Sequence, residues 1–470
     1  MSSKDYDLTI IGAGAGGLIA ADFAARLGAK VAIVERDRIG GDCTWTGCVP
    51  SKALLKVAKV AHMANLASRY GIIVQRPVTD MKVVRAYVDG AVNQIYQATT
   101  PKALERKGID VYQGHARFLS SREVSVDERR LPSRKFLITT GAHPIIPTIE
   151  GLGSVPYSTY KSIFNLERLP KSLIVIGAGP VGTELTQAFQ RIGAQVTVIA
   201  ERILSKEESS VQGVIQRVFE REGVRFVFGR ARSIRREGTD IIVTTGKEQA
   251  RGDLVLVAIG REPTLDDLDL EKAGVDYTHR GIKVDGRLRT SVKNIFAAGD
   301  VAAGAYQYSH FAGWQAFHAV RNALLPGSSR GFTDIVPRVT FTDPEVAHVG
   351  LEEQQARSAF GDRTTIQNWT LDRVDRAVCE DDRDGFLKIT AKRNGTILGA
   401  TLVSQSAGEA ITEFALAIRH KLKVMDLANT IHAYPTYSSG VQLMLTEMTL
   451  ETLLSGTSGR IVRGLSALVR

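Results

Sequence analysis

One local pattern occurs twice in the chain: a short apolar run, a glycine-rich turn, a helical stretch and a second apolar run. The first copy spans residues 7 to 35 and the second spans residues 173 to 199. In both copies the glycines have the spacing Gly-x-Gly-x-x-Gly. They are Gly12, Gly14 and Gly17 in the first copy and Gly177, Gly179 and Gly182 in the second. Each copy predicts a strand–turn–helix–strand unit whose helix N-terminus faces a pyrophosphate, so the chain should bind two dinucleotides.

Each glycine of the first copy has its own physical reason. Gly12 permits the tight turn, Gly14 lets the backbone approach a pyrophosphate, and Gly17 lets helix and strand pack closely. Glu35 follows the second apolar run. A carboxylate at that place suits the two hydroxyls of an unphosphorylated ribose.

Length and composition predict a globular protein of several domains. A chain of 470 residues is too long for one hydrophobic core, and its 44% hydrophobic and 23% charged residues are typical of globular domains. No apolar run approaches the length of a membrane span, and Met1–Lys4 leads into a strand without a signal-peptide pattern, so we expect a cytoplasmic protein. The net charge is +10, but the arginines are scattered, so we expect no nucleic-acid partner.

The C-terminal residues 460–470 have apolar residues at helical spacing, with arginines between them. This pattern is compatible with contact with a membrane surface or a partner, and equally with a frayed terminal helix.

The cysteine pattern indicates redox chemistry. Cys43 and Cys48 lie in one glycine-rich loop, and Cys379 is isolated and expected to be inert. Three cysteines cannot form a disulfide scaffold, and two cysteines without a matching His or Cys cluster cannot complete a tetrahedral metal site, so we expect no structural metal. A helical run begins near Ser51, and a helix N-terminus near the loop favours a thiolate.

The segment Gly40–Lys52, with a distant strand that ends in Gly299-Asp300, resembles the class I pyridine nucleotide-disulfide oxidoreductases. This family includes dihydrolipoamide dehydrogenase, glutathione reductase and mercuric reductase. Residues 138–142 and 257–261 look like its two crossovers between domains, and residues 340–345 look like the start of its dimerisation domain. The resemblance therefore covers almost the whole chain.

The resemblance implies an α/β fold: two doubly wound Rossmann-like dinucleotide-binding domains plus a C-terminal α+β dimerisation domain, in a homodimer. The expected FAD domain is 1–150, completed by 266–335, and the NAD(P)H domain is 151–265. The dimerisation domain is 336–470, with strands near 386–390 and 397–403 and helices near 408–421 and 438–454.

The family also implies residue roles. Cys48 would be the charge-transfer thiolate beside the flavin, and Cys43 would be the interchange thiol that meets the substrate. Lys52 and Glu184 would form an ion pair close to the flavin, and both are counted with the catalytic residues, as is Tyr434. The residues expected to bind FAD are Gly12, Gly14, Gly17, Glu35, Lys52, Gly141 and Asp300. Those expected to bind the nicotinamide cofactor are Gly177, Gly179, Gly182, Glu184, Arg202, Lys206 and Gly260.

The choice between NADPH and NADH depends on the residues after the strand that ends at Ile199. The place of a ribose-binding acid is occupied by Ala200, and Arg202 and Lys206 are near enough along the chain to neutralise a 2′-phosphate. This predicts NADPH. Glu201 leaves NADH possible, because its carboxylate could bind free ribose hydroxyls.

The electron acceptor is suggested by a departure from the family. Disulfide-reducing members carry His-Pro-Thr and then Glu near the C-terminus, whereas this chain has Tyr434 in place of the histidine and Ser439 in place of the glutamate. His432 lies two residues earlier, where an extended segment would turn it to the same side. Tyrosine is a poor proton shuttle at neutral pH, so disulfide substrates should react slowly.

A tyrosine at this position resembles mercuric reductase, and Tyr437 would add a second hydroxyl near an incoming ion. A thiophilic metal ion is therefore the expected acceptor. Mercuric reductase also has a vicinal cysteine pair near its C-terminus, which residues 465–470 lack, so other small acceptors stay open. The alternatives are a dihydrolipoamide dehydrogenase-like disulfide reductase, a quinone reductase or transhydrogenase, and a redox-sensing flavoprotein without sustained turnover.

Overall fold

The structure is a computed structural model that describes residues 5–454 and 456–469. Met1–Lys4, which start the chain, and Arg470, the last residue of the basic tail, lie outside the described residues. The chain forms two compact units. The first consists of Met1–Glu201 and Glu222–Thr333, and the second of Arg202–Arg221 and Asp334–Arg470.

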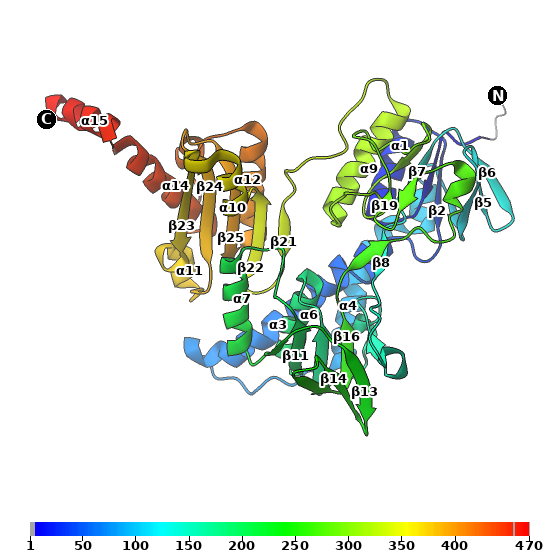
Figure 1. Cartoon of the computed structure of the whole chain (residues 1–470), viewed down its shortest axis with the longest axis horizontal. Helices are drawn as coiled ribbons and strands as arrows, with labels where there is room; N and C mark the ends of the chain where they lie inside the picture. Colours follow the sequence, from blue (N-terminus) through cyan, green and yellow to red (C-terminus); the bar gives the residue numbers. More distant parts are fainter. Residues whose placement is uncertain (1–4, 455, 470) are drawn as a thin grey trace. The chain divides into compact units, whose positions relative to one another are not determined.

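A five-stranded parallel sheet with the strand order β20-β7-β1-β2-β3 contains the first glycine-rich unit. Its strands are β1 (Leu8–Ile11), β2 (Val31–Glu35), β3 (Ile109–Gln113), β7 (Phe136–Ile138) and β20 (Ile295–Ala297). All four residues of β1 are buried, as expected for a parallel strand that is covered on both faces. Helices α1 (Ala15–Arg26) and α9 (Ser309–Leu324) pack against one another beside this sheet (Figure 1).

A second parallel sheet, of strand order β12-β11-β10-β16-β9, contains the second glycine-rich unit. Its strands are β9 (Tyr157–Ser158), β10 (Ser172–Ile176), β11 (Gln195–Ala200), β12 (Arg225–Phe228) and β16 (Leu254–Val257). Helix α6 (Pro180–Arg191) follows the turn after β10. Both sheets are doubly wound around the strand that enters the glycine turn, which confirms the predicted α/β fold.

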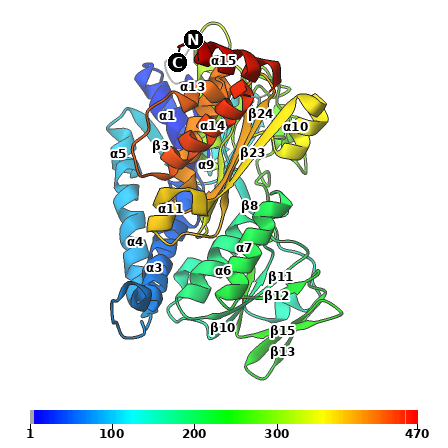
Figure 2. The same ribbon diagram turned by 90° about the vertical axis from the view of Figure 1, so that its left-hand side faces the viewer.

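Smaller elements complete the first unit. Strands β8 (Ala142–Pro144) and β17 (Arg261–Pro263) pair antiparallel, where the two crossovers were expected. Helices α3 (Cys48–Leu66) and α4 (Met81–Tyr96) lie side by side (Figure 2). The other helices are α2 (Gly41–Trp45), α5 (Pro101–Glu105) and α8 (Leu270–Ala273). The other strands are β4 (Ala116–Ser120), β5 (Glu123–Val126), β6 (Arg129–Pro132), β13 (Ser233–Glu237), β14 (Asp240–Thr244), β15 (Gln249–Gly252), β18 (Tyr277–Thr278) and β19 (Gly281–Ile282).

The second unit is built on an antiparallel sheet with the strand order β21-β22-β25-β24-β23. These strands are β21 (Arg338–Thr340), β22 (Glu345–Gly350), β23 (Thr364–Thr370), β24 (Phe386–Lys392) and β25 (Ile397–Ser404). The helices of this unit are α7 (Ser209–Arg221), α10 (Glu353–Phe360), α11 (Asp375–Cys379), α12 (Ala407–His420), α13 (Val424–Ala428), α14 (Tyr437–Leu454) and α15 (Gly456–Val469). The predicted antiparallel sheet with helices on it is confirmed.

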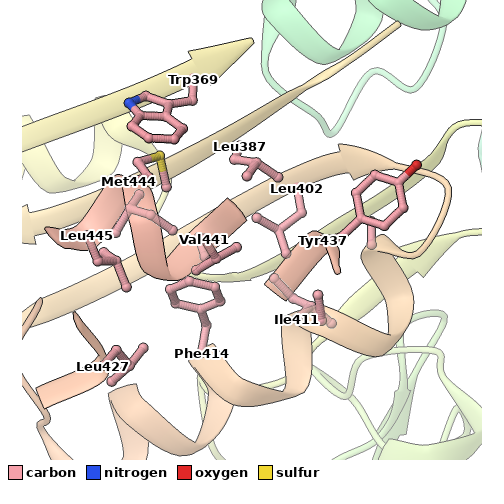
Figure 3. Close-up of a cluster of buried hydrophobic side chains, with 14 of the residues drawn as sticks. Trp369, Leu387, Leu402, Ile411, Phe414, Leu427, Tyr437, Val441, Met444 and Leu445 are labelled. Carbon is pink, nitrogen blue, oxygen red and sulfur yellow. The ribbon is translucent and has the colours of Figure 1, made fainter. Parts of the chain in front are cut away.

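Helices α12 and α14 share one apolar core with this sheet (Figure 3). Phe414 of α12 and Met444 of α14 are both fully buried in this cluster. Trp369 of β23 and Leu402 of β25 belong to the same cluster and contribute to it from the sheet. The core fixes the start of α14 and therefore the segment around Tyr434 that precedes it.

The basic tail forms most of α15, and Ile461, Leu465 and Leu468 are exposed on it. Within residues 5–454 and 456–469, no helix combines the length and the apolar character needed to span a bilayer. The structure thus agrees with the helical pattern of the tail.

Candidate active site

The cysteine loop places Cys48 at the first residue of α3. The helix begins three residues before Ser51, which corrects the expected start, and the Ser51 N–H donates to the Gly47 carbonyl over 3.1 Å. Cys43 lies inside the short helix α2. The N–H groups of the first turn of α3 have no partner within the helix, so this end of the helix favours negative charge at Cys48.

The two sulfur atoms are free thiols with opposite pKa shifts. The pKa of Cys48 is lowered to about 6: the hydrogen bonds with Cys43 and Ser309 and the charge of Lys52 lower it, against the opposing effects of burial and of the Glu184 charge. The hydrogen bond with Cys48 and burial raise the pKa of Cys43. In the reduced loop, these shifts favour negative charge on Cys48 over Cys43.

Ser309 is a site residue that the sequence did not reveal. Its Oγ lies 3.3 Å from the Cys48 Sγ, although 261 positions separate the two residues. Ser309 is the first residue of α9, so two helices begin at this sulfur atom. The sequence signal for Ser309 is a polar residue at the start of the helix that follows Gly299-Asp300. Polar residues are too common at helix starts for this signal to identify a site residue.

The expected ion pair between Lys52 and Glu184 is present. The Lys52 Nζ lies 2.8 Å from the Glu184 Oε2, and only 8% of the Glu184 side chain is exposed. Helices α3 and α6, which carry the two residues, pack against one another. A buried carboxylate needs such a partner, because an unpaired buried charge is strongly destabilising.

The first glycine turn fits a dinucleotide. A Cβ at Gly12 would lie 2.5 Å from the Thr139 carbonyl oxygen, and a Cβ at Gly17 would lie 1.9 Å from that of Gly12. Glu35 accepts hydrogen bonds from the backbone N–H groups of Ala13 (2.7 Å) and Asp37 (2.8 Å), and burial raises its pKa. The turn is thus packed as tightly as the Rossmann motif requires, with an acid at the end of β2.

Asp300, expected at the flavin ribityl chain, is ion-paired with Arg261. Among the described residues, the buried Nε of Arg261 has no hydrogen-bond partner. An unsatisfied buried N–H is costly, so this group fits a site that receives a ligand oxygen. Gly260 precedes Arg261 in the chain, and its carbonyl accepts from the Ile145 N–H, while the Gly141 carbonyl accepts from the Thr264 N–H, each over 3.0 Å. The two crossovers therefore meet beside Asp300.

The second glycine turn has the same construction. A Cβ at Gly177 would lie 2.4 Å from the Ala258 carbonyl oxygen, and a Cβ at Gly182 would lie 2.1 Å from that of Gly177. A Cβ at Gly179 would meet no atom within 4 Å. Gly179 thus faces open space, where the backbone can approach a pyrophosphate.

The cations expected to select NADPH are exposed, but they belong to a different unit from this turn. Arg202 and Lys206 are in the second unit, whereas the glycines are in the first. Glu201, which could instead bind ribose hydroxyls, is ion-paired at 3.0 Å with Arg230, which follows the neighbouring strand β12. Arg230 is a further cation near the end of β11 that was not considered from the sequence.

The segment around Tyr434 differs from the expectation. Tyr434 is 70% exposed, and its hydroxyl donates to Asp375 over 2.6 Å. The side chain of His432 is only 8% exposed and contacts Glu413 over 2.9 Å. The two side chains therefore have different surroundings, and the prediction that they face the same side was wrong, because the segment is irregular and not an extended strand.

Ser439 and Tyr437 have structural partners. The Thr436 Oγ1 accepts from the Ser439 N–H, and the Ser439 Oγ accepts from the Thr436 N–H, each over 3.0 Å, which forms a reciprocal cap at the start of α14. Tyr437 is buried and its hydroxyl donates to Asp382 over 2.7 Å, so the second hydroxyl expected near an incoming ion is engaged in the core. Cys379, the third cysteine, is exposed at the end of α11.

Two dinucleotide-binding sheets, a dithiol loop at a helix N-terminus and a separate antiparallel domain define a flavin-dependent disulfide oxidoreductase. The family model described as pyridine nucleotide-disulphide oxidoreductase matches residues 6–321, and the model of its dimerisation domain matches residues 336–445. The chain belongs to the pyridine nucleotide-disulphide oxidoreductase family. It is accordingly an enzyme that uses FAD and NAD(P)H, and its dimerisation domain supports a homodimer.

Several relatives align along most of the chain. A mercuric reductase of Streptomyces lividans is 36% identical over 455 residues, which cover 93% of this chain and 95% of the relative. A dihydrolipoyl dehydrogenase of Haloferax volcanii is 35% identical over 454 residues, 93% of this chain and 94% of the relative. The solved structure of a Cu(II) complex of RclA, an HOCl-induced flavoprotein disulfide reductase from Escherichia coli, is similar with a TM-score of 0.86 and 26% identity, covering 95% of this chain and all of that one.

The open space at Gly179 predicts a selective defect. In Gly179→Ala the methyl group should leave the fold intact but occupy the path of the nicotinamide pyrophosphate, raising KM for the nicotinamide cofactor by about tenfold or more. FAD content and thermal stability should stay at the wild-type values. The matched variant Gly182→Ala should instead lose roughly 1–3 kcal/mol of stability, because its methyl group meets backbone. Equal thermal stability of the two variants would contradict this assignment.

Ser309 should tune the ionisation of Cys48. The wild-type thiolate should form as pH rises through about 6. In the wild type the hydrogen bond from Ser309 lowers the pKa of Cys48, so its removal in Ser309→Ala should move that midpoint upward. The midpoint can be followed in the reduced holoenzyme by the long-wavelength absorbance of a thiolate against flavin. Ser51→Ala is the control, because its hydroxyl bonds the Cys48 carbonyl and not the sulfur. An unchanged midpoint in Ser309→Ala would disprove the role.

Proposed function

We propose that this enzyme transfers two electrons from NADPH, through FAD and the Cys43–Cys48 disulfide, to a soft, thiophilic metal ion. One combination carries the proposal: the pKa of the Cys48 thiol is lowered, and Tyr434 stands where disulfide-reducing members have their acid–base histidine. The balance is simple: the hydride of NADPH supplies both electrons, a divalent ion takes both, and the proton is released. The mercuric reductases among the relatives support this acceptor class.

When bound, FAD carries the electron pair from the nicotinamide to the disulfide. We assign its binding to the first glycine turn with Glu35, Gly141 and Asp300, and the nicotinamide cofactor to the second turn with Gly260. The ion pair with Glu184 fixes the ammonium group of Lys52, and the charge of Lys52 lowers the pKa of Cys48. Ser309 and the N-terminus of α3 stabilise the Cys48 thiolate, and Cys43 is left as the thiol that meets the acceptor.

The case against a disulfide substrate depends on the proton that its leaving thiolate requires. Tyr434 donates its hydroxyl hydrogen bond to Asp375, and this bond raises its pKa above the ordinary tyrosine value. General acid–base help is typically worth about 10²–10⁴ in rate, and a phenol held in this way supplies little of it near neutral pH. When the two thiolates of the loop hold the metal ion, its two-electron reduction re-forms the Cys43–Cys48 disulfide, so this step leaves no thiolate to protonate.

A second candidate is a dihydrolipoamide dehydrogenase-like activity, which the dihydrolipoyl dehydrogenases among the relatives favour. In that case, another group would have to supply the proton. His432 is a poor alternative, because both of its ring nitrogens are engaged, one by the Thr430 carbonyl and the other by the Glu413 carboxylate. We propose that either reaction takes place in the reducing cytoplasm, where a cysteine pair of this kind is expected to do redox chemistry.

We retain three functional domains in this proposal. Residues 1–150 with 266–335 would bind FAD, residues 151–265 would bind the nicotinamide cofactor, and residues 336–470 would form the dimer and present Tyr434. The parallel sheets around β1 and β10 and the antiparallel sheet of the second unit support this division.

A panel of acceptors tests the function. With NADPH, purified enzyme should turn over Hg(II) supplied with excess thiol at least about a hundredfold faster than lipoamide or glutathione disulfide, following the value of acid–base help. Cys48→Ser and Cys43→Ser should each abolish this activity and retain FAD. Brisk lipoamide turnover that Tyr434→Phe leaves unchanged would refute the argument from Tyr434, and undiminished turnover in Cys48→Ser would favour a flavin-only quinone reductase.

The cofactor preference has its own test. The wild-type enzyme should show a higher kcat/KM for NADPH than for NADH, because Ala200 removes the acid that would repel a 2′-phosphate. The double variant Arg202→Gln/Lys206→Gln should lose about tenfold in kcat/KM for NADPH, through KM, and leave the NADH value unchanged. A wild-type preference for NADH, or equal losses with both cofactors, would contradict the assignment.

A further inference from the structure

A chain of polar contacts distinct from the Lys52–Glu184 pair leads away from the cysteine loop. It begins at Asp42, the residue before Cys43. The Asp42 carboxylate accepts a hydrogen bond of 2.7 Å from the Tyr160 hydroxyl and one of 3.4 Å from the Thr46 hydroxyl. The Lys161 Nζ lies 3.7 Å from the same carboxylate. Thus α2 is held from outside the loop by the turn that follows β9.

Tyr160 links Asp42 to Arg261, because its side chain contacts both residues. Only 8% of the residue is exposed, and its ring centroid lies 5.9 Å from the guanidinium carbon of Arg261. Burial and the charge of Asp42 raise the pKa of Tyr160, so its hydroxyl remains a hydrogen-bond donor. A buried ring with a fixed donor at its tip has little freedom to move.

Arg261 continues the chain to Asp300. The two residues form a partly buried ion pair, and Arg261 opens β17 while Asp300 follows β20. Burial lowers the pKa of Arg261, and the charges of Asp300 and Asp42 outweigh it and raise that pKa above the ordinary value. Four segments that are distant in sequence are therefore linked in the order Asp42, Tyr160, Arg261 and Asp300, all within the first unit.

The cysteine loop needs such support. Helix α2 has five residues, which is too short to be stable by itself. Gly40 and Gly41, before and at its first residue, have φ values of 108° and 57°, so the chain enters α2 through two left-handed residues that do not continue a helix. The position of Cys43 relative to Cys48 therefore depends on side-chain contacts that hold α2.

We propose that Tyr160 is a positioning residue. Through its hydrogen bond to Asp42, it fixes the position of the Cys43–Cys48 loop relative to Arg261 and Asp300. The inference rests on the proposed roles of the two cysteines and of Asp300. It adds to them a side chain whose task is to keep the disulfide correctly placed against the flavin site.

The test compares three holoenzymes: wild type, Tyr160→Phe and Tyr277→Phe. Tyr277 is the matched control, because its hydroxyl also donates to a carboxylate, that of Glu271, in an exposed part of the same unit. Tyr160→Phe should keep one FAD per chain and the wild-type KM for NADPH. Its kcat with Hg(II) should fall about fivefold or more, and the long-wavelength absorbance of the reduced enzyme should weaken, because a lost hydrogen bond to a charged group loosens the loop. Tyr277→Phe should match the wild type.

Two results would overturn the inference. One is a Tyr160→Phe enzyme with wild-type kcat and absorbance. The other is a loss of FAD with unchanged absorbance per bound FAD, which would limit Tyr160 to flavin binding. A wild-type enzyme that lacks the absorbance on reduction would instead refute the proposed cysteine roles, so the two failures are distinguishable.

A double-variant cycle isolates the contact between the two side chains. If Tyr160 acts through Asp42, Asp42→Ala combined with Tyr160→Phe should lower kcat no further than the more severe single variant. Effects that multiply would show independent roles and overturn the proposal.

Discussion

The hydrogen bond between Cys48 and Ser309 joins the first residues of two helices at one sulfur atom. Helix α9 packs against α1, which begins at the first glycine turn, and α3 packs against α6, which begins at the second. The position of the thiolate therefore depends on both dinucleotide folds at once. A shift of either helix would change the stabilisation of negative charge at Cys48. The opposite pKa shifts of the two thiols come first from the hydrogen bond between them, and the hydrogen bond with Ser309 lowers the pKa of Cys48 further.

The sequence was sufficient for features that depend on local geometry. The glycine spacing predicted both doubly wound sheets, because a Cβ at Gly17 or Gly182 would overlap backbone in any chain that makes this turn. The antiparallel sheet of the second unit followed from its pattern of strands and helices. The Lys52–Glu184 contact is also present, but it was reached through the family resemblance and not from the spacing of the two residues.

Contacts between distant segments could not be predicted. Ser309 and Tyr160 look like an ordinary helix start and an ordinary turn residue, and their partners are supplied by tertiary packing. The error at His432 has a similar origin, because its burial against Glu413 follows from the packing of α12 and not from the local spacing. Ser439 has a chemical and a structural aspect. It lacks the carboxylate that the disulfide-reducing members have at this position, and its side chain and backbone form the cap at the start of α14.

The exposed Cys379 gives the molecule an internal reference for counting thiols. It lies at the end of α11 in the second unit, whereas the loop that holds the other two cysteines belongs to the first unit. A reagent that labels exposed sulfhydryl groups should therefore register a constant background of one per polypeptide, whatever the oxidation state of the loop. The labelling above this background then measures the reduced cysteines of the loop. The Cys379 signal calibrates that measurement in each preparation.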